Sequence, residues 1–244
     1  NRGMHENELI EYLAKHNGFA KDYKNLFPNK EETIRLLLKI TLPNDLDSSF
    51  FEMEQDFIRH MNSRIQIADS KSLICIDGVA LFLGNPLFIK ADALMDPLFS
   101  SFYEPKSFMS RELSDDIIFH GGIEIRKELL EELSQQGHEM SEGEIHITKG
   151  YALPFKEIIH CSFPNELKTN EDVETFSETY LNALRTFLKQ TGKTLVIPLL
   201  AAKKDENVFF IKTAKSFLKT MGSKKNVIFA TNNENTYEQS SFLF

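Results

Sequence analysis

Ten consecutive residues near the middle of the chain contain side chains that could act on a polar ligand. They include two adjacent carboxylates, Asp115 and Asp116, then His120 and a further carboxylate, Glu124. A carboxylate can orient a water molecule or a hydroxyl group, and a histidine can carry a proton near neutral pH. One hypothesis is therefore hydrolytic chemistry carried by these four side chains. The alternative is that the acids are solvated or capping residues and that His120 is a hydrogen-bonded structural residue.

Two other groups could hold an anion. Gly121 and Gly122 precede an apolar-periodic segment, and backbone N–H groups at the start of a helix attract negative charge. Lys203 and Lys204 could attract a phosphate as point charges. The competing interpretations are a tight turn for the glycine pair and a solvated loop for the lysines.

Composition limits the class of protein. The 244 residues contain 41% hydrophobic and 26% charged side chains, which is typical of a globular protein with a sizeable core. A formal net charge of −8 with scattered lysines argues against nonspecific binding to nucleic acid or to an anionic membrane. Cys75 and Cys161 each lie in an apolar run, where a free thiol behaves as a small hydrophobe.

No leader or apolar run of about 20 residues is present, so we expect a cytoplasmic protein. Residues 1–3, before Met4, look like the remnant of a tag and are left out of the reasoning.

The arrangement of apolar residues changes near residue 70. Residues 5–70 are helical in pattern, with Asn29 and Asp47 as expected N-caps. Beyond residue 70, short apolar runs alternate with helical segments, which predicts an α/β domain with a largely parallel or mixed sheet. The expected strands are residues 73–76, 86–89, 145–147, 157–161, 195–199 and 227–230, and the expected helices are residues 123–134, 170–189, 208–221 and a short one near Tyr237.

The segment from Gly143 to Pro164 predicts a strand, a tight turn and a buried strand. Its turn-forming, apolar and polar residues follow one another at fixed positions: Gly143, Thr148, Gly150, Tyr151, Leu153, Pro154, Ile159, His160 and Pro164. This spacing resembles the centre of a macrodomain, the fold that binds ADP-ribose. The resemblance implies a three-layer α/β/α fold with a mixed central sheet, here residues 71–244, and makes residues 1–70 an N-terminal helical extension packed on that core.

Residues 32–68 resemble the helical extension of the microbial zinc-containing macrodomains, which remove ADP-ribose from proteins. The family places a Cys, His, Cys cluster after its second core strand, whereas residues 95–114 contain neither residue type. We therefore expect no zinc and no other cofactor.

The resemblance also locates the contacts to the nucleotide. The family has Gly-Asp-Ile after its first core strand, where the Asp binds the adenine amino group, and we match this run to Gly78-Val79-Ala80, with Asp77 one position early. The strand that follows ends in Asn-Ala-Ala-Asn in the family, and we match it to residues 90–93. Both the acid and the ribose-positioning Asn are then missing.

Two further family features are also absent. The phosphate loop Ser-Thr-Gly-x-x-Gly corresponds to residues 199–207, which contain no glycine. Asn232 follows the last strand, where relatives commonly place an aromatic ring. A second alignment, of residues 121–124 with the family's Gly-Gly-Val-Asp, would restore a glycine loop and an acid but needs a gap in the helix.

Three functions remain open on this basis. The first is a degenerate, non-catalytic binding or regulatory module for ADP-ribose or a related nucleotide, with contacts from Asp77, Gly78, His120, Gly121, Gly122, Lys203, Lys204 and Asn232. The second is an active ADP-ribosyl hydrolase that uses Asp115, Asp116, His120 or Glu124. The third is a protein-interaction platform in which the apolar tail, residues 242–244, docks a partner.

Overall fold

A computed structural model of the chain describes residues 2–19, 29–99 and 112–244. The chain divides into two compact units. Unit 1 consists of residues 1–66, 101–139 and 151–153, and unit 2 of residues 67–100, 140–150 and 154–244. The predicted division at residue 70 lies close to the first of these boundaries, but unit 1 also takes in a later part of the chain. The two-part organisation predicted from the sequence stays a prediction.

Unit 1 is helical where the structure describes it. The expected N-caps are confirmed, because the side chain of Asn29 accepts a hydrogen bond from the N–H of Glu32 and that of Asp47 from the N–H of Phe50. Its helices are α1 (Arg2–His16), α2 (Lys30–Ile40), η2 (Pro43–Asp45), α3 (Ser48–Asn62), α4 (Leu113–Gly121) and α5 (Glu124–Gln136). Helix α4 was not predicted, and Asp115 and Asp116 lie in its first turn.

Unit 2 contains a six-stranded sheet in the order β2-β8-β7-β4-β6-β5. β5 pairs antiparallel with β6, and the other pairings are parallel, so the predicted mixed α/β sheet is confirmed. The strands are β2 (Val79–Leu83), β4 (Ala93–Leu98), β5 (Ile145–Lys149), β6 (Glu157–Ser162), β7 (Thr194–Pro198) and β8 (Asn226–Thr231). β1 (Ala68–Asp69) and β3 (Ile89–Lys90) form a separate pair, and η3 (Ser70–Ser72) follows β1.

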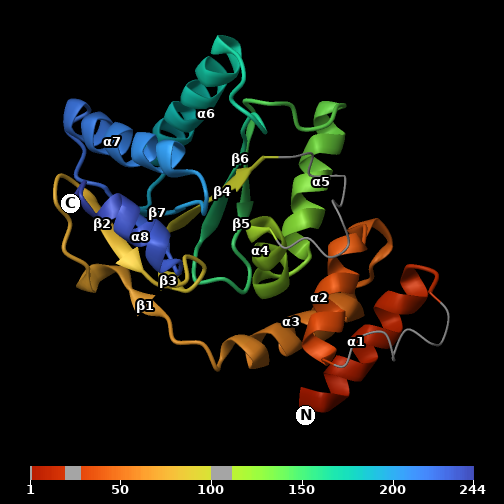
Figure 1. The fold of residues 1–244 in the computed structure, drawn as a ribbon. Helices are drawn as coiled ribbons and strands as arrows, with labels where there is room; N and C mark the ends of the chain where they lie inside the picture. The colour runs from red at the N-terminus through yellow and green to blue at the C-terminus, as the bar shows by residue number, and fades with distance from the viewer. Residues whose placement is uncertain (1, 20–28, 100–111) are drawn as a thin grey trace. The chain divides into compact units, whose positions relative to one another are not determined.

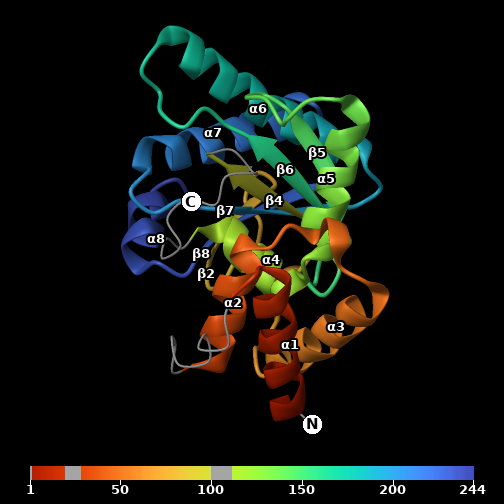
Figure 2. The same cartoon turned by 90° about the vertical axis from the view of Figure 1, so that its right-hand side faces the viewer.

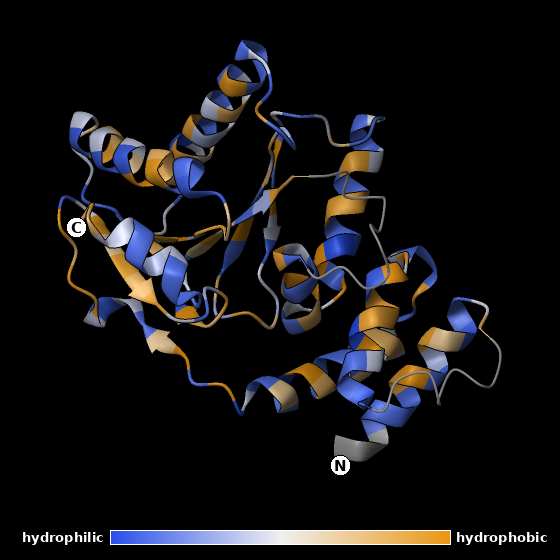
Figure 3. Ribbon diagram, in the orientation of Figure 1, coloured by the Kyte–Doolittle hydropathy of each residue, from blue (hydrophilic) through white to orange (hydrophobic). Residues whose placement is uncertain are grey.

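Helices α6 (Asn170–Lys189) and α7 (Lys204–Thr220) lie over one face of this sheet (Figures 1 and 2). Their apolar stripes face the strands, as the hydropathy colouring shows (Figure 3). Tyr180 of α6 packs on Phe210 of α7 at a ring distance of 4.4 Å and donates a hydrogen bond to its carbonyl oxygen. The core of unit 2 is therefore rich in aromatic side chains, which bury large apolar areas.

The C-terminal helix α8 (Glu234–Ser241) contacts β2, β8 and α7. After it, Leu243 and Phe244 pack against the core of unit 2, and the ammonium of Lys215 lies 4.9 Å from the Phe244 ring centroid. Phe242 is 67% exposed. Most of the apolar tail is thus packed in place, which leaves Phe242 as its exposed side chain.

Two of the short strands were misplaced in the sequence analysis. Residues 73–76 form only an isolated bridge between Ile76 and Val79, and the strand begins after the turn at Asp77 and Gly78. Residues 86–88 lie in a turn before β3. The strand β4 was not predicted, because Asp96 and Pro97 interrupt its apolar pattern.

The turn after β5 explains one glycine of the Gly143–Pro164 segment. A Cβ atom on Gly150 would lie 2.1 Å from the carbonyl oxygen of Phe155, far inside van der Waals contact. Only glycine therefore allows the backbone to reverse between β5 and β6. Among the described residues no helix is long and apolar enough to span a membrane.

Candidate functional site

The parallel strands of unit 2 end at one edge of the sheet, which we call the carboxyl edge. In open α/β sheets ligands bind outside the carboxyl ends of the strands, where their loops diverge. Here β4 and β7 pair over only two residue pairs, Ala93 with Leu195 and Leu94 with Val196. Pro97 has no N–H to continue that ladder. The strands are therefore unpaired toward the carboxyl edge, between Phe99 after β4 and Leu199 after β7.

The loop after β7 is a tight turn held by one buried amide. Asn207, which is 2% exposed, accepts a hydrogen bond from the N–H of Leu200 at 2.9 Å and donates one to its carbonyl oxygen at 2.8 Å. The N–H of Lys203 donates to the carbonyl oxygen of Leu200. Ala202 has a φ of 61°, in the left-handed region that favours glycine. The loop therefore uses part of its own backbone to close the turn.

The two lysines at this edge differ in their surroundings. The ammonium of Lys203 lies 4.6 Å from the ring centroid of Phe99, a distance at which a cation and an aromatic face attract each other. Phe99 also stacks on Phe163, with ring centroids 5.5 Å apart. Lys204 is exposed at the start of α7, followed by the acidic residues Asp205 and Glu206. The positive charge of the loop is thus partly offset by neighbouring carboxylates.

Amide side chains follow β2, at one edge of the sheet, and its neighbour β8. Gly84 comes directly after β2, and its N–H donates to the carbonyl oxygen of Thr231 at the end of β8. The next residue, Asn85, is exposed, and its Oδ1 accepts a hydrogen bond from the N–H of Leu87 at 3.0 Å. After β8, Asn232 and Asn233 are both exposed. Asn233 caps α8, since its Oδ1 accepts from the N–H of Thr236.

Asp77 and Gly78 lie at the opposite edge. They form the turn before β2, and the carbonyl oxygen of Gly78 accepts a hydrogen bond from the N–H of Val227, at the start of β8. Lys203, Lys204 and Asn232 instead follow the carboxyl ends of their strands. The structure therefore brings these three together at one edge of the sheet and places Asp77 and Gly78 at the other.

The segments that follow the strands differ from those matched to the family in the sequence analysis. The segment directly after the first core strand is Gly84-Asn85-Pro86, and the next strand of the sheet ends in Asp96-Pro97-Leu98 followed by Phe99. Asn85 was missed because the first strand was predicted to begin too early, and Phe99 was missed because β4 was not predicted as a strand. The turn-forming run Gly84-Asn85-Pro86 after five apolar residues was the signal that could have identified Asn85.

In unit 1, the backbone N–H groups of Gly122 and of the next residue, Ile123, already donate hydrogen bonds within the protein. The N–H of Gly122 donates to the carbonyl oxygen of Ile118, and the N–H of Ile123 donates to both carboxylate oxygens of Glu54, at 3.0 and 3.3 Å. Both glycines are buried, so the expectation that they expose N–H groups to a ligand was wrong. The Glu54 carboxyl sits where an anion would bind at the start of α5, and burial raises its pKa to about 8.

The remaining candidates in unit 1 are engaged in local structure. Asp115 accepts a hydrogen bond from the N–H of Glu112 at 3.1 Å in a capping box and pairs with Lys39 at 3.4 Å. Asp116 is its neighbour in the first turn of α4. The Nδ1 atom of His120 lies 3.0 Å from Oδ1 of Asn62. Burial raises the pKa of Glu124.

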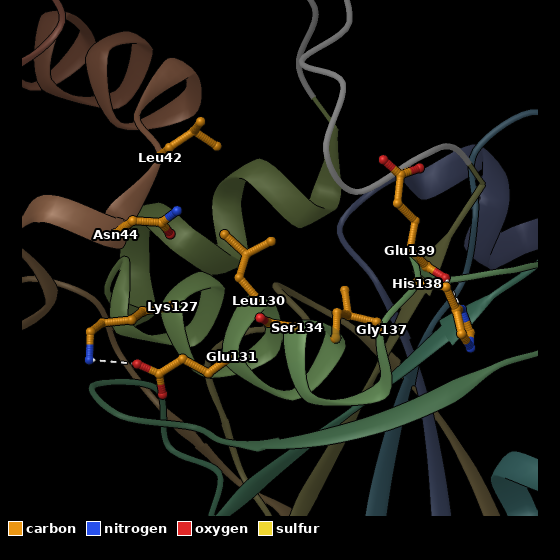
Figure 4. A pocket seen from close by; sticks show the side chains of 10 residues that line it. Leu42, Asn44, Lys127, Leu130, Glu131, Ser134, Gly137, His138 and Glu139 are labelled. Carbon is orange, nitrogen blue, oxygen red and sulfur yellow. Dashed lines mark hydrogen bonds and ion pairs between the residues drawn. The ribbon is translucent and has the colours of Figure 1, made fainter.

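The described residues of unit 1 line at least two hollows. The larger, about 670 Å³, runs beside α5 and has leucine side chains, among them Leu42 and Leu130, with the Lys127–Glu131 ion pair at its rim (Figure 4). None of the predicted site residues lines it. The smaller, about 260 Å³, includes His120 beside Arg35 and Arg64. Each of these arginines pairs with a glutamate, Glu32 and Glu31 respectively, so the smaller hollow has balanced charge.

A buried polar chain crosses three strands of unit 2. The Nδ1 atom of His160 on β6 lies 2.7 Å from the carboxylate of Asp96 on β4, and its Nε2 atom lies 2.8 Å from the hydroxyl of Thr148 on β5. All three are at most 2% exposed. Each of these buried polar groups has a hydrogen-bond partner, which offsets the cost of removing it from water. The interactions join the three strands and fix their register.

Comparison with known proteins gives a consistent result. The family model described as "Macro domain" matches residues 107–205. A protein-ADP-ribose hydrolase of Staphylococcus aureus (strain MRSA252) is 26% identical over 217 residues, which is 83% of this chain and 80% of the relative.

The structural neighbours are of the same kind. The Trypanosoma brucei macrodomain in complex with ADP matches 96% of this chain and 95% of its own length, with a TM-score of 0.60 and 16% identity. The macro domain of ganglioside induced differentiation associated protein 2 matches 71% of this chain and 94% of its own length, with a TM-score of 0.59 and 21% identity. At these identities the structural comparison supports the fold.

Proposed function

Because the chain belongs to the macrodomain family, we propose that it is a non-catalytic binding or regulatory module for a nucleotide of the ADP-ribose class. Relatives named protein-ADP-ribose hydrolases and a neighbour bound to ADP support the nucleotide as ligand. The carboxyl edge of unit 2 is the proposed binding surface. Its contacts are Asn85, Phe99, Lys203, Lys204 and Asn232.

The loop after β7 is the observation that carries this proposal. A pyrophosphate is bound most strongly when several backbone N–H groups converge on it, which requires glycines that allow close approach. Here the N–H groups of Leu200 and Lys203 already have partners within the loop, and Ala202 carries a methyl group at the left-handed position. Binding of a diphosphate here therefore depends on the charges of the lysines. That attraction is weaker than binding by several converging N–H groups, and it is screened by salt.

The proposal that the module is non-catalytic rests on unit 1. Hydrolysis needs a group that can orient or deprotonate water within hydrogen-bond reach of the scissile bond. Asp115 is held by the Glu112 N–H and by Lys39, and His120 is held by Asn62. The loss of zinc, inferred from residues 95–114, remains a prediction, since residues 100–111 lie outside the described part of the chain.

Two measurements test the proposal. Calorimetric titration with ADP-ribose should give binding weaker than roughly 10 μM, and AMP should bind more weakly still. Incubation with a mono-ADP-ribosylated protein should release no ADP-ribose, with the Staphylococcus aureus hydrolase as the positive control. No heat at millimolar ADP-ribose would refute nucleotide binding, and release above the no-enzyme background would refute the non-catalytic assignment.

An active hydrolase is the second candidate, favoured by the names of the relatives that match 83% of the chain. In that case the catalytic group would be Asp115, Asp116, His120 or Glu124. Asp116→Asn and Glu124→Gln change charge with little change in shape, so they are the variants to compare. Loss of the measured release in either variant, with an unchanged melting temperature, would support the hydrolase and assign its acid.

A further inference from the structure

The edge of the sheet opposite the carboxyl edge, which we call the amino edge, carries a row of lysines. Lys156 comes directly before β6, Lys193 directly before β7, and Lys224 shortly before β8. Lys189 is the last residue of α6, in the segment that leads to Lys193. All four residues are exposed. They are scattered in the sequence, and the order of the strands brings them to one edge.

Backbone hydrogen bonds show that the segments carrying these lysines are neighbours. The N–H of Lys156 donates to the carbonyl oxygen of Asp92 at 3.0 Å, and the N–H of Lys193 donates to the Asp92 carboxylate at 2.7 Å. The N–H of Asn226, at the start of β8, donates to the carbonyl oxygen of Lys193 at 2.8 Å. Because β6, β4, β7 and β8 are adjacent in that order, the row from Lys156 to Lys224 is about 15 Å long.

The carboxylates at this edge do not neutralise the row. Asp92 is half-buried, and its Oδ2 atom accepts hydrogen bonds from the N–H groups of Lys193 and Thr194. Glu157, the first residue of β6, is also half-buried, and burial raises its pKa. Asp77 lies before β2, beyond the β8 end of the row. Between β6 and β8, four exposed lysines therefore face two half-buried acids.

The four ammonium groups also lack partners. Among the residues that the structure describes, none of them makes an ion pair, a hydrogen bond or a contact with an aromatic ring. Other basic side chains do pair with acids, such as Arg185 on α6, which lies 3.7 Å from Glu178. The chain has 36 acidic and 28 basic residues, so adjacent exposed lysines without partners are unusual for its composition. An anionic partner would meet unpaired positive charge here.

We propose that Lys156, Lys189, Lys193 and Lys224 bind a short acidic segment of a partner protein. An extended segment rises about 3.3 Å per residue, so about five residues span the row. Ammonium groups on flexible stems attract carboxylates as point charges and need no fixed geometry. This surface is separate from the proposed nucleotide site, which lies at the carboxyl edge.

Two features favour an acidic peptide over a nucleic acid. The chain as a whole has a formal net charge of −8, so a polyanion longer than the row is repelled outside it. Proteins that bind single strands without sequence preference also use aromatic rings on which bases stack. Phe155 and Phe187, the aromatic residues nearest in sequence to Lys156 and Lys189, are buried. A short peptide stays within the row and needs no such ring.

Hexaglutamate is the probe for this site, and hexaglutamine is its uncharged counterpart. Nuclear magnetic resonance titration of the isotopically labelled full chain locates binding, because amide signals next to the peptide shift. Hexaglutamate should shift the signals of Lys156, Lys193 and Lys224 with a Kd below about 1 mM at low salt. Hexaglutamine should leave them in place, and roughly 0.2 M salt should weaken hexaglutamate binding several-fold. No shift at several millimolar hexaglutamate would overturn the proposal.

Lys193→Gln removes one charge from the middle of the row and keeps the backbone hydrogen bonds of residue 193. It should raise the Kd for hexaglutamate about two- to fivefold, with an unchanged melting temperature. Lys212→Gln is the matched control, since Lys212 is exposed in the middle of α7 and carries the same charge. Its Kd should stay within about 1.5-fold of that of the unaltered chain. Equal weakening in the two variants would mean that overall charge, and not the row, attracts the peptide.

Two further measurements separate the acidic peptide from other occupants. Tighter binding of hexathymidylate than of hexaglutamate at the same salt would assign the row to nucleic acid. A dimer of the unaltered chain that salt and Lys193→Gln both weaken, as seen by sedimentation, would assign it to a second copy of the chain. Either result would overturn the proposed partner, whereas a monomer that prefers hexaglutamate is the expected outcome.

Discussion

Replacing Ala202 by glycine should stabilise the protein, although glycine usually destabilises. Ala202 has a φ of 61°, where the Cβ atom of an L-residue crowds the backbone at a cost of about 1–2 kcal/mol. Glycine removes that cost and adds about 0.4–1 kcal/mol of conformational freedom to the unfolded chain. The net effect is roughly 0.5–1 kcal/mol of stabilisation, which for a chain of this size is a rise in melting temperature of about 1–4 °C.

Ala201→Gly is the matched control for this prediction. Ala201 is exposed in the same turn, and its φ is not positive. Glycine there should destabilise by about 0.4–1 kcal/mol, because only the unfolded-state effect acts. The difference between the two variants therefore measures the strain alone, about 1–2 kcal/mol.

Urea unfolding and thermal melting of the two variants and the unaltered chain give the comparison. A loss of stability in Ala202→Gly equal to that in Ala201→Gly would refute strain at residue 202. It would also show that the left-handed backbone conformation at residue 202 does not favour glycine over alanine.

Three further results follow from the structure. Glu54→Gln should flatten the pH dependence of stability. Burial raises the pKa of Glu54 to about 8 in the folded protein, against 4.5 for an exposed glutamate, so the stability of the unaltered chain falls by at most about 5 kcal/mol as pH rises through that window, which urea unfolding at several pH values would show. Asn207→Ala should lower the free energy of unfolding by about 1–3 kcal/mol and speed amide hydrogen exchange at Leu200. Unchanged exchange would show that the Asn207 side chain does not hold the loop after β7. Thr148→Val should cost about 1–3 kcal/mol by removing the hydroxyl partner of His160, and Thr148→Ser should restore most of it.

The sequence predicted the elements whose signals are local. Helix α6 has the predicted bounds, because its apolar period is long and Thr169 and Asp172 form a capping box at its start. The N-caps Asn29 and Asp47 were found for the same reason. Each of these signals lies within a few residues of the element that it starts.

The elements that were missed depend on partners far along the chain. Asp96 makes the sequence of β4 unlike that of a buried strand. Its carboxylate can be buried only because it pairs with His160, which lies 64 residues later in the sequence. Glu54 is 69 residues from Ile123, so the occupied N-terminus of α5 could not be read from the glycine pair. The wrong start of the first strand also displaced the sequence comparison, which took Asp77 instead of Asn85 as the residue next to that strand's end.

Phe99 links the two changes at the carboxyl edge. A side chain at the end of β4 that cannot hydrogen-bond a sugar also offers its ring face to the Lys203 ammonium, an attraction worth about 0.5–1 kcal/mol when exposed. A phosphate must compete with that contact for the ammonium and also faces the carboxylates of Asp205 and Glu206. The phosphate binding proposed for this edge is thus weakened twice, by the closed turn of the backbone and by the contact of the Lys203 ammonium with Phe99.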